Sequence, residues 1–290
     1  MKYAYYPGCS LKGTGRAYEE SLLAVLRALD VEVEELPDWN CCGATTYMSF
    51  DELQSYALAG RNLSLAKRTG QDLMAPCAAC YLVLNKTQYY VRDYPWIGEI
   101  VSQALDAIRL PRDISARVRH PLDILLNDVG LTSITAKIKY PLKGLKVAPY
   151  YGCQLVRPYA LFDSQRDPTS MDRLLQACGA QIVYFPVKTQ CCGGSQKGTL
   201  PEIGLDLIRH LLAEAQRNGA ETIATVCPLC QFNLEAFQEQ ASNAHQFHLP
   251  VLYFTQLVAV ALGIPLKEAG FQRSFLSIEP ILAAKEIAYA

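Results

Sequence analysis

The chain has 290 residues, half of them hydrophobic and 19% charged, so it is long enough to bury a core in each of two domains. Its 27 basic and 28 acidic residues give a net charge of −1, which argues against nucleic acid or an anionic membrane surface as a general partner. The most apolar stretch, residues 251–262, is shorter than the roughly 20 residues of a membrane-spanning helix, and residues 1–7 have no signal-peptide core. We therefore expect a cytoplasmic protein without a membrane span.

The first half of the chain alternates short apolar runs with segments of helical spacing. We predict strands at residues 2–6, 31–36 and 72–75, and helices at residues 16–29, 50–68, 79–91 and 122–129. Gly70 follows the second helix as a typical C-cap residue. Each predicted strand leads directly to one or two cysteines.

The second half repeats this order. We predict strands at residues 146–149, 181–185 and 222–226, and helices at residues 170–178, 203–217 and 251–262. The first half differs by an insertion near residues 89–111, whose Tyr89, Tyr90, Tyr94 and Trp96 would suit either a partner surface or a satellite apolar cluster.

Ten of the eleven cysteines form two sets of the same pattern, a single cysteine, an adjacent pair and a CxxC. The first set is Cys9, Cys41, Cys42, Cys77 and Cys80, and the second is Cys153, Cys191, Cys192, Cys227 and Cys230. The offset between the sets is 144 for the first member and 150 for the other four. This spacing predicts two copies of one domain, at residues 1–140 and 141–290, joined by a basic linker at 137–144.

Strands that alternate with helices predict an α/β fold with a small, Rossmann-like parallel sheet flanked by helices in each domain. Parallel strands end at the same edge of a sheet, where open α/β sheets bind ligands. We therefore expect all five cysteines of a set to gather at the carboxyl ends of three neighbouring strands.

Eleven cysteines in a reducing compartment indicate metal or redox chemistry rather than a disulfide framework. Thiolate-only sites favour zinc or iron–sulfur clusters, but a structural zinc ion and a standard four-iron cluster each take four ligands. The fifth thiolate, supplied by the adjacent pair, suits an enlarged or asymmetric cluster better than zinc. Gly43 and Gly193, which follow the two pairs, are expected to remove a side chain beside that cluster.

This double motif resembles the CCG-domain proteins, and specifically the B-type subunit of heterodisulfide reductase. The resemblance spans almost the whole chain, including residues 5–9, 40–43, 76–80, 141–153 and 191–194. It implies one noncubane [4Fe-4S] cluster per half, held by the five cysteines of each set, and cleavage of a disulfide between the two clusters.

The resemblance also implies an oxidoreductase subunit that acts on a small disulfide or thiol. The chain has no GxGxxG after a strand and no ferredoxin-type cysteine run, so its electrons are expected to come from a flavin-containing A-like subunit and a ferredoxin-like C-like subunit. Two alternatives stay open. One is an electron-transfer subunit of a quinone-linked dehydrogenase, and the other is a zinc-stapled interaction module without catalysis.

The remaining candidate residues have plain structural interpretations. Cys178, outside both sets, is expected to be a small core residue. Lys12 and Lys197 could meet an anionic substrate, but they are not at equivalent repeat positions. The four histidines, His120, His210, His245 and His248, are expected to have surface or capping roles. Four tyrosines beside the first cysteines, Tyr5, Tyr6, Tyr150 and Tyr151, would either pack on the strands or bond a cluster.

Overall fold

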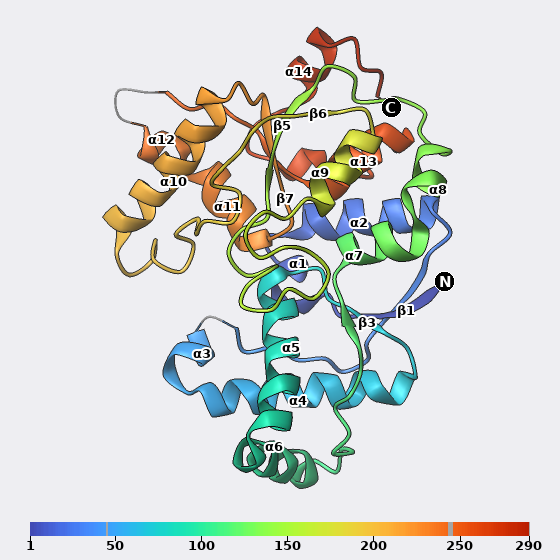
Figure 1. Cartoon of the computed structure of the whole chain (residues 1–290), viewed down its shortest axis with the longest axis vertical. Helices are drawn as coiled ribbons and strands as arrows, with labels where there is room; N and C mark the ends of the chain where they lie inside the picture. Colours follow the sequence, from blue (N-terminus) through green and yellow to red (C-terminus); the bar gives the residue numbers. More distant parts are fainter. Residues whose placement is uncertain (45, 243–245, 290) are drawn as a thin grey trace. The chain divides into compact units, whose positions relative to one another are not determined.

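In this computed structural model, which describes residues 1–44, 46–242 and 246–289, the strands form two sheets of four parallel strands each (Figure 1). The first sheet has the order β2-β1-β3-β4, and the second has the order β6-β5-β7-β8. Each sheet thus places its first strand between its second and third strands. This confirms the predicted α/β class and its tandem, flanking-helix architecture.

The first sheet belongs to a compact unit that contains Met1–Lys12 and Val31–Pro121. Its strands are β1 (Lys2–Tyr5), β2 (Glu32–Glu35), β3 (Leu73–Met74) and β4 (Val118–Arg119). Its helices are α1 (Gly8–Lys12), α3 (Thr46–Phe50), α4 (Glu52–Thr69), α5 (Ala78–Asp93) and α6 (Pro95–Ala107). Helices α4, α5 and α6 pack against one another (Figure 1).

The second sheet belongs to a unit that contains Gly13–Asp30 and Leu122–Ala290. Its strands are β5 (Lys146–Tyr150), β6 (Gln181–Ile182), β7 (Thr222–Thr225) and β8 (Val251–Tyr253). Its main helices are α2 (Arg16–Ala28), α8 (Leu131–Thr135), α9 (Ser170–Ala177), α10 (Pro201–Arg217), α11 (Pro228–Ala236) and α13 (Phe254–Leu262). The shorter helices are the π-helix η1 (Leu125–Val129), α12 (Gln238–Ala241), the 3₁₀ helix η2 (Phe271–Arg273) and α14 (Glu279–Ala284). Helix α7 (Pro121–Ile124) contains the boundary between the two units.

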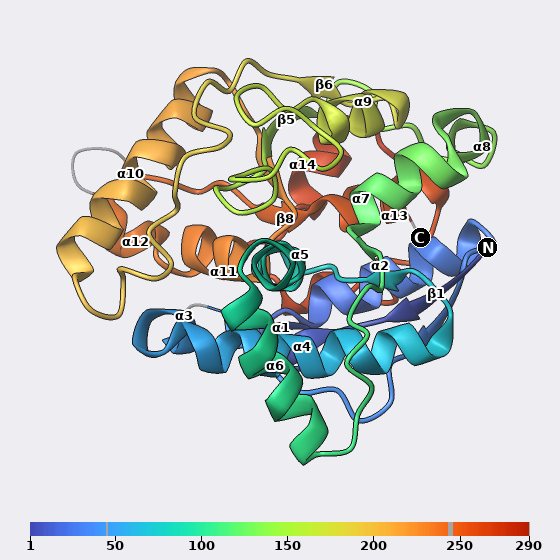
Figure 2. The ribbon, with the colours of Figure 1, turned by 60° about the horizontal axis from the view of Figure 1, so that its bottom comes forward.

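Helix α2 precedes the first adjacent cysteine pair in the sequence but packs within the second unit, against α13 (Figure 2). The ring of Tyr18 stacks on Tyr253 with centroids 4.6 Å apart, and the buried hydroxyls of Ser21 and Thr255 lie 2.7 Å apart. The contacts of the chain therefore group its segments differently from the division into residues 1–140 and 141–290. That division stays a prediction about the repeats.

The helix predicted at residues 251–262 is wrong at its start, because residues 251–253 form β8 and only residues 254–262 form α13. The fourth strand of the first sheet, β4, was likewise not predicted. Both strands are very short and every residue in them is buried, so the alternation that identifies a half-exposed strand is missing. Within the described residues, no helix combines the length and apolarity needed to cross a membrane.

Candidate metal centres

The first set of five cysteines lies at the carboxyl ends of β1, β2 and β3. Cys9 is in α1, Cys41 and Cys42 follow β2, Cys77 is the N-cap residue of α5, and Cys80 is in the first turn of that helix. The Sγ atoms of Cys9 and Cys41 are 3.8 Å apart, and those of Cys42 and Cys80 are 3.3 Å apart. β1 lies between β2 and β3 and is parallel to both, so the ends of the three strands bring the thiols together as predicted.

The second set has the same arrangement at the ends of β5, β6 and β7. Cys153 follows β5, Cys191 and Cys192 lie between β6 and α10, Cys227 is the N-cap residue of α11, and Cys230 is in its first turn. The Sγ atoms of Cys192 and Cys230 are 3.4 Å apart. In both sets the second cysteine of the adjacent pair and both cysteines of the CxxC are buried, whereas the other two are more accessible.

All eleven cysteines are free thiols. Sulfur-only donor sets of this kind are typical of iron–sulfur clusters and of zinc, so the residues present fit the cluster that the motif implies. Over residues 1–44, 46–242 and 246–289, no three His, Cys, Asp or Glu side chains are arranged to hold a single metal ion.

Hydrogen bonds between the thiols separate their pKa values. The bonds that join Cys42 with Cys41 and Cys80 lower the pKa of Cys42 to about 5, while the bond with Cys42 and burial raise the pKa of Cys80. In the second set, the bond with Cys153 lowers the pKa of Cys191 to about 6 and raises that of Cys153. Thiolates this close repel one another, so a cationic group bound among them would stabilise the ionised form of a whole set.

A glycine in the left-handed region lies beside each set. Gly8 has φ +65°, and a Cβ atom built on it would lie 3.1 Å from Cys80 Sγ. Gly152 has φ +69°, and its Cβ would lie 3.3 Å from Cys230 Sγ. Any side chain at either position would therefore press on a sulfur atom as well as strain the backbone.

Gly43 and Gly193 each lie against the helix that follows their cysteine pair. A Cβ atom on Gly43 would lie 2.8 Å from Ser55 Oγ of α4, and one on Gly193 would lie 3.0 Å from Gly204 Cα of α10. These glycines let each cysteine-pair loop approach the helix that follows it. The backbone N–H of Gly193 also donates to Cys191 Sγ at 3.3 Å. The role expected for both glycines beside a cluster stays a prediction.

A profile of the family described as "CCG: Cysteine-rich domain" matches residues 3–85 and 147–235, which together are more than half of the chain. The chain belongs to the CCG family of cysteine-rich domain proteins. Each match contains all five cysteines of one set, so the two predicted copies are confirmed as two CCG repeats.

Two relatives align with this CCG protein over most of its length. It is 30% identical over 286 residues to the 8-methylmenaquinol:fumarate reductase membrane anchor subunit of Wolinella succinogenes, covering 95% of this chain and 97% of the relative. It is 31% identical over 280 residues to a protein of Archaeoglobus profundus named as similar to the B-type subunit of heterodisulfide reductase, covering 93% and 94%. The chain is thus homologous to the B-type subunit of heterodisulfide reductase.

The crystal structure of a hypothetical protein from Helicobacter pylori has the same fold, with a TM-score of 0.75 and 16% sequence identity. The superposition covers 95% of this chain but only 52% of the other, so the CCG protein spans about half the length of that chain.

One tyrosine in each repeat supports the loop that carries the adjacent cysteines. The hydroxyl of Tyr6 donates a hydrogen bond to the carbonyl oxygen of Asn40 at 2.7 Å, and that of Tyr150 donates to Gln190 at the same distance. Asn40 and Gln190 directly precede the cysteine pairs. The motif spacing predicted that these tyrosines lie near the sites, but it contained no sign of their shared backbone partner.

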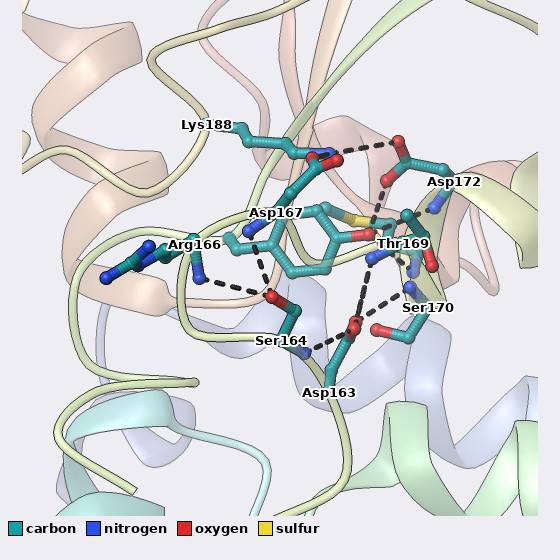
Figure 3. A network of polar contacts seen from close by, with 10 residues as sticks. Asp163, Ser164, Arg166, Asp167, Thr169, Ser170, Asp172 and Lys188 are labelled. Carbon is teal, nitrogen blue, oxygen red and sulfur yellow. Dashed lines mark hydrogen bonds and ion pairs between the residues drawn. The ribbon is translucent and has the colours of Figure 1, made fainter. Parts of the chain in front are cut away.

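A loop specific to the second repeat connects Cys153 to α9. This segment, residues 154–169, is held by Lys188, whose ammonium pairs with Asp167 at 2.6 Å and with Asp172 at 3.5 Å (Figure 3). Lys188 lies shortly before the second cysteine pair. The ion pairs therefore link the segments that follow Cys153 and precede Cys191.

The amino end of α9 completes this network. The hydroxyl of Tyr151 donates to the Asp172 carboxylate and accepts the backbone N–H of Met171 at 2.8 Å. The Asp163 carboxylate accepts the N–H of Ser170 at 2.8 Å (Figure 3). Burial raises the pKa of Asp172. Tyr151 thus anchors a helix start rather than facing the thiols.

The other candidates have structural partners. Lys12 pairs with Glu35 at 2.9 Å, and the ammonium of Lys197 lies 4.4 Å from the ring centroid of Phe237. Cys178 is completely buried, and burial raises the pKa of its thiol to about 12. These positions agree with the core role expected for Cys178 and give neither lysine a free charge directed at a substrate.

Of the histidines that the structure describes, His120 contacts the backbone beside the first cysteine set. His120 is completely buried rather than on the surface, and its Nε2 lies 2.9 Å from the carbonyl oxygen of Pro76, the residue before Cys77. His210 and His248 are exposed, and His245 lies outside the described residues.

The insertion forms the end of α5 and the whole of α6. Tyr90 joins an aromatic cluster, with its ring centroid 5.3 Å from that of Tyr56 and 5.2 Å from that of Tyr94. Trp96 stays 57% exposed. Tyr94 is 47% exposed as well. The satellite-cluster interpretation therefore describes the half-buried Tyr90, whereas Tyr94 and Trp96 lie largely on the surface.

Proposed function

We propose that this CCG protein is the iron–sulfur subunit of a heterodisulfide-reductase-like complex, an oxidoreductase acting on sulfur groups. Each set of five cysteines would hold one noncubane [4Fe-4S] cluster. The substrate would be a small disulfide or, in the reverse direction, two thiols. Electrons would be exchanged with a flavin-containing A-like subunit and a ferredoxin-like C-like subunit.

The observation that carries this proposal is the duplicated five-thiol set at equivalent strand ends, in a chain homologous to the B-type subunit of heterodisulfide reductase. A disulfide takes up two electrons when its S–S bond breaks into two thiolates. When bound, two such clusters can supply one electron each, and their iron can stabilise a thiolate product.

The residues of the chain itself would provide ligands and keep them in place. Cys42, Cys80, Cys192 and Cys230 are buried, which keeps water from these sulfur atoms, while Cys9 and Cys41 are accessible enough for a substrate to approach. Gly8 and Gly152 leave the backbone close to the sulfur atoms of Cys80 and Cys230.

Anaerobic purification followed by iron and acid-labile sulfide analysis tests the cofactor. We expect a brown protein with about eight irons per chain, four in each cluster. Low-temperature EPR of the oxidised protein should then change when a thiol substrate is added. A colourless chain with two zinc ions would overturn the proposal and leave the zinc-stapled module.

The relative from Wolinella succinogenes favours a second candidate, because that protein is named as a subunit of an 8-methylmenaquinol:fumarate reductase. In this case the chain would transfer electrons between a quinol and a dehydrogenase partner. EPR signals that ignore thiols but respond to a menaquinol analogue in the whole complex would select this candidate.

A further inference from the structure

The loop of the first cysteine pair is held by a buried asparagine. The side-chain Oδ1 of Asn62 accepts the backbone N–H of Asn40 at 3.0 Å, and its Nδ2 donates to the Asn40 carbonyl at 2.9 Å. Asn62 is completely buried. One amide thus satisfies both backbone polar groups of the residue that precedes Cys41.

The same face of α4 holds the other end of this loop. Ser55, seven residues before Asn62 and therefore two helical turns away, donates its hydroxyl to the carbonyl of Gly43 at 3.2 Å. The Asn40 side chain adds a bond from its Nδ2 to the carbonyl of Cys41 at 2.8 Å. Polar groups of α4 therefore fix the backbone on both sides of the Cys41-Cys42 pair.

The second repeat lacks this device. Ser55 faces Gly43 as Gly204 faces Gly193, so the positions of α10 equivalent to Ser55 and Asn62 are Gly204 and Leu211, and Leu211 is buried. Neither side chain offers a donor or acceptor to the Cys191-Cys192 loop, so the backbone of this loop must be held from elsewhere.

The second loop is instead held by the helix that follows the CxxC. The Nδ2 of Asn233, on α11, donates to the carbonyl of Cys192 at 2.6 Å, and Asn233 is 2% exposed. The equivalent residue in α5 is Val83, which is also buried. Each repeat therefore has one buried asparagine for its cysteine pair, and the two asparagines come from different helices.

We infer that Asn62 and Asn233 are positioning residues, each of which sets the backbone of one cysteine pair and thereby the direction of its two thiols. Asn62 acts on Cys41 and Cys42 by bonding the backbone of Asn40. Asn233 acts on Cys192 by bonding the carbonyl oxygen of Cys192 itself. The inference rests on the ligand role proposed above for these cysteines.

The chemistry of adjacent ligands explains the need for such residues. Two consecutive side chains diverge in a regular backbone, so both thiols of a pair reach one metal centre only in a particular loop conformation. A buried carbonyl or N–H without a partner is costly, so one amide strongly favours the conformation that satisfies it. Residues of this kind around metal ligands control affinity and cofactor properties.

The repeat supplies its own test substitutions, Asn62→Leu and Asn233→Val, each of which introduces the residue of the other repeat. In the iron-free chain, peptide mapping measures the rate at which iodoacetamide alkylates each cysteine. We expect Asn62→Leu to raise the alkylation rate of Cys41 and Cys42 about tenfold, as loss of buried hydrogen bonds implies, and to leave Cys191 and Cys192 unchanged. Asn233→Val should have the converse effect.

Two further variants separate positioning from general destabilisation. Asn85→Leu removes another buried asparagine, whose Nδ2 bonds the Tyr81 carbonyl within α5 at 2.8 Å, and should leave both cysteine pairs unchanged. Tyr6→Phe keeps the ring and removes only the 2.7 Å bond to Asn40, so it should raise alkylation of the first pair by a smaller factor.

The cofactor is measured separately, after reconstitution with ferrous iron and sulfide. Asn62→Leu should alter only the EPR signal that Cys42→Ser abolishes, and Asn233→Val only the signal that Cys192→Ser abolishes. If the wild-type chain takes up no iron, the proposed function fails, whereas the alkylation rates still test the positioning role. The inference is overturned if either asparagine variant changes the alkylation rates of both cysteine pairs equally. It is also overturned if neither asparagine variant nor Tyr6→Phe changes the alkylation rate of any pair.

Discussion

The two CCG repeats share the positions of their thiols but not the residues that support them. Each set follows the three equivalent strands of its own sheet. In both repeats a tyrosine hydroxyl bonds the carbonyl of the residue before the cysteine pair, and a glycine lies against the sulfur atom of the last cysteine. Around this frame, the first pair is held by polar residues of α4. The second pair is held by Asn233 of α11, and Lys188, three residues before Cys191, forms ion pairs with Asp167 and Asp172.

This difference shows which features a duplicated site keeps. If both copies hold a cofactor, as proposed, their ligand positions must match its geometry and tolerate little change. A backbone carbonyl needs only some donor within reach, and any neighbouring helix can provide it. Support can therefore move from one helix to another while the thiols stay in place.

The largest expected effect comes from removing one thiol of an adjacent pair. Cys42→Ser should abolish the first cluster and Cys192→Ser the second, because serine is a poor ligand for the irons of such a cluster. Each variant should keep about half of the iron and the EPR signal of the other repeat.

Cys178→Ser is the matched control, since Cys178 is a buried thiol outside both sets. It should lower stability while leaving the iron content intact. Loss of both signals in either pair variant would show that the two sites depend on each other, which would break the comparison between two separate centres.

A smaller effect is expected at the glycines beside the sulfur atoms. Gly8→Ala places a methyl group 3.1 Å from Cys80 Sγ in a backbone with positive φ, at a cost of about 2–4 kcal/mol from strain and overpacking. Gly152→Ala, with 3.3 Å to Cys230 Sγ, should cost less. Iron content and thermal unfolding measure the two effects.

Gly70→Ala provides the control for backbone strain. Gly70 also has a positive φ, +68°, but a Cβ atom there would meet nothing within 4 Å. It should reduce stability by about 1 kcal/mol without loss of iron. An equal loss of iron in Gly70→Ala and Gly8→Ala would contradict a specific role for the space beside the sulfur atom.

The smallest effect concerns Glu235, whose equivalent in the first repeat is the neutral Asn85. Burial raises the pKa of the Glu235 carboxyl from the ordinary 4.5 to about 7, although it accepts bonds from Gln231 and from the backbone of Val251 and Phe275. The folded state then binds a proton more tightly than the unfolded state. The contribution of the Glu235 carboxyl to the free energy of unfolding is therefore complete below about pH 4.5 and is lost as the pH rises to about 7.

Thermal unfolding of the wild type and Glu235→Gln between pH 5 and pH 8 measures this difference. The free energy of unfolding of the wild type should fall by about 1–3 kcal/mol relative to the variant over this range. Parallel pH profiles would show that folding does not raise the pKa of Glu235, and would contradict this pH-dependent difference between the repeats.

Much of the architecture follows from local sequence pattern. The equal spacing of the cysteines identified two copies, and the alternation of strands and helices led to parallel sheets with all five thiols at one edge. Residues 251–253 were assigned to a helix because their buried strand continues without a break into the apolar α13. Strands of two residues, such as β3 and β4, have too short a pattern to define their neighbours.

The sequence by itself determined where the thiols stand, because periodicity and spacing are local properties and the parallel topology does the rest. Only the tertiary structure decided what holds them. Asn62 lies 22 positions after Asn40, and Asn233 lies 41 positions after Cys192. Contacts this distant in sequence cannot be predicted from the local pattern of residues. The packing of α2 with α13, like these contacts, depends on which surfaces meet after the chain has folded.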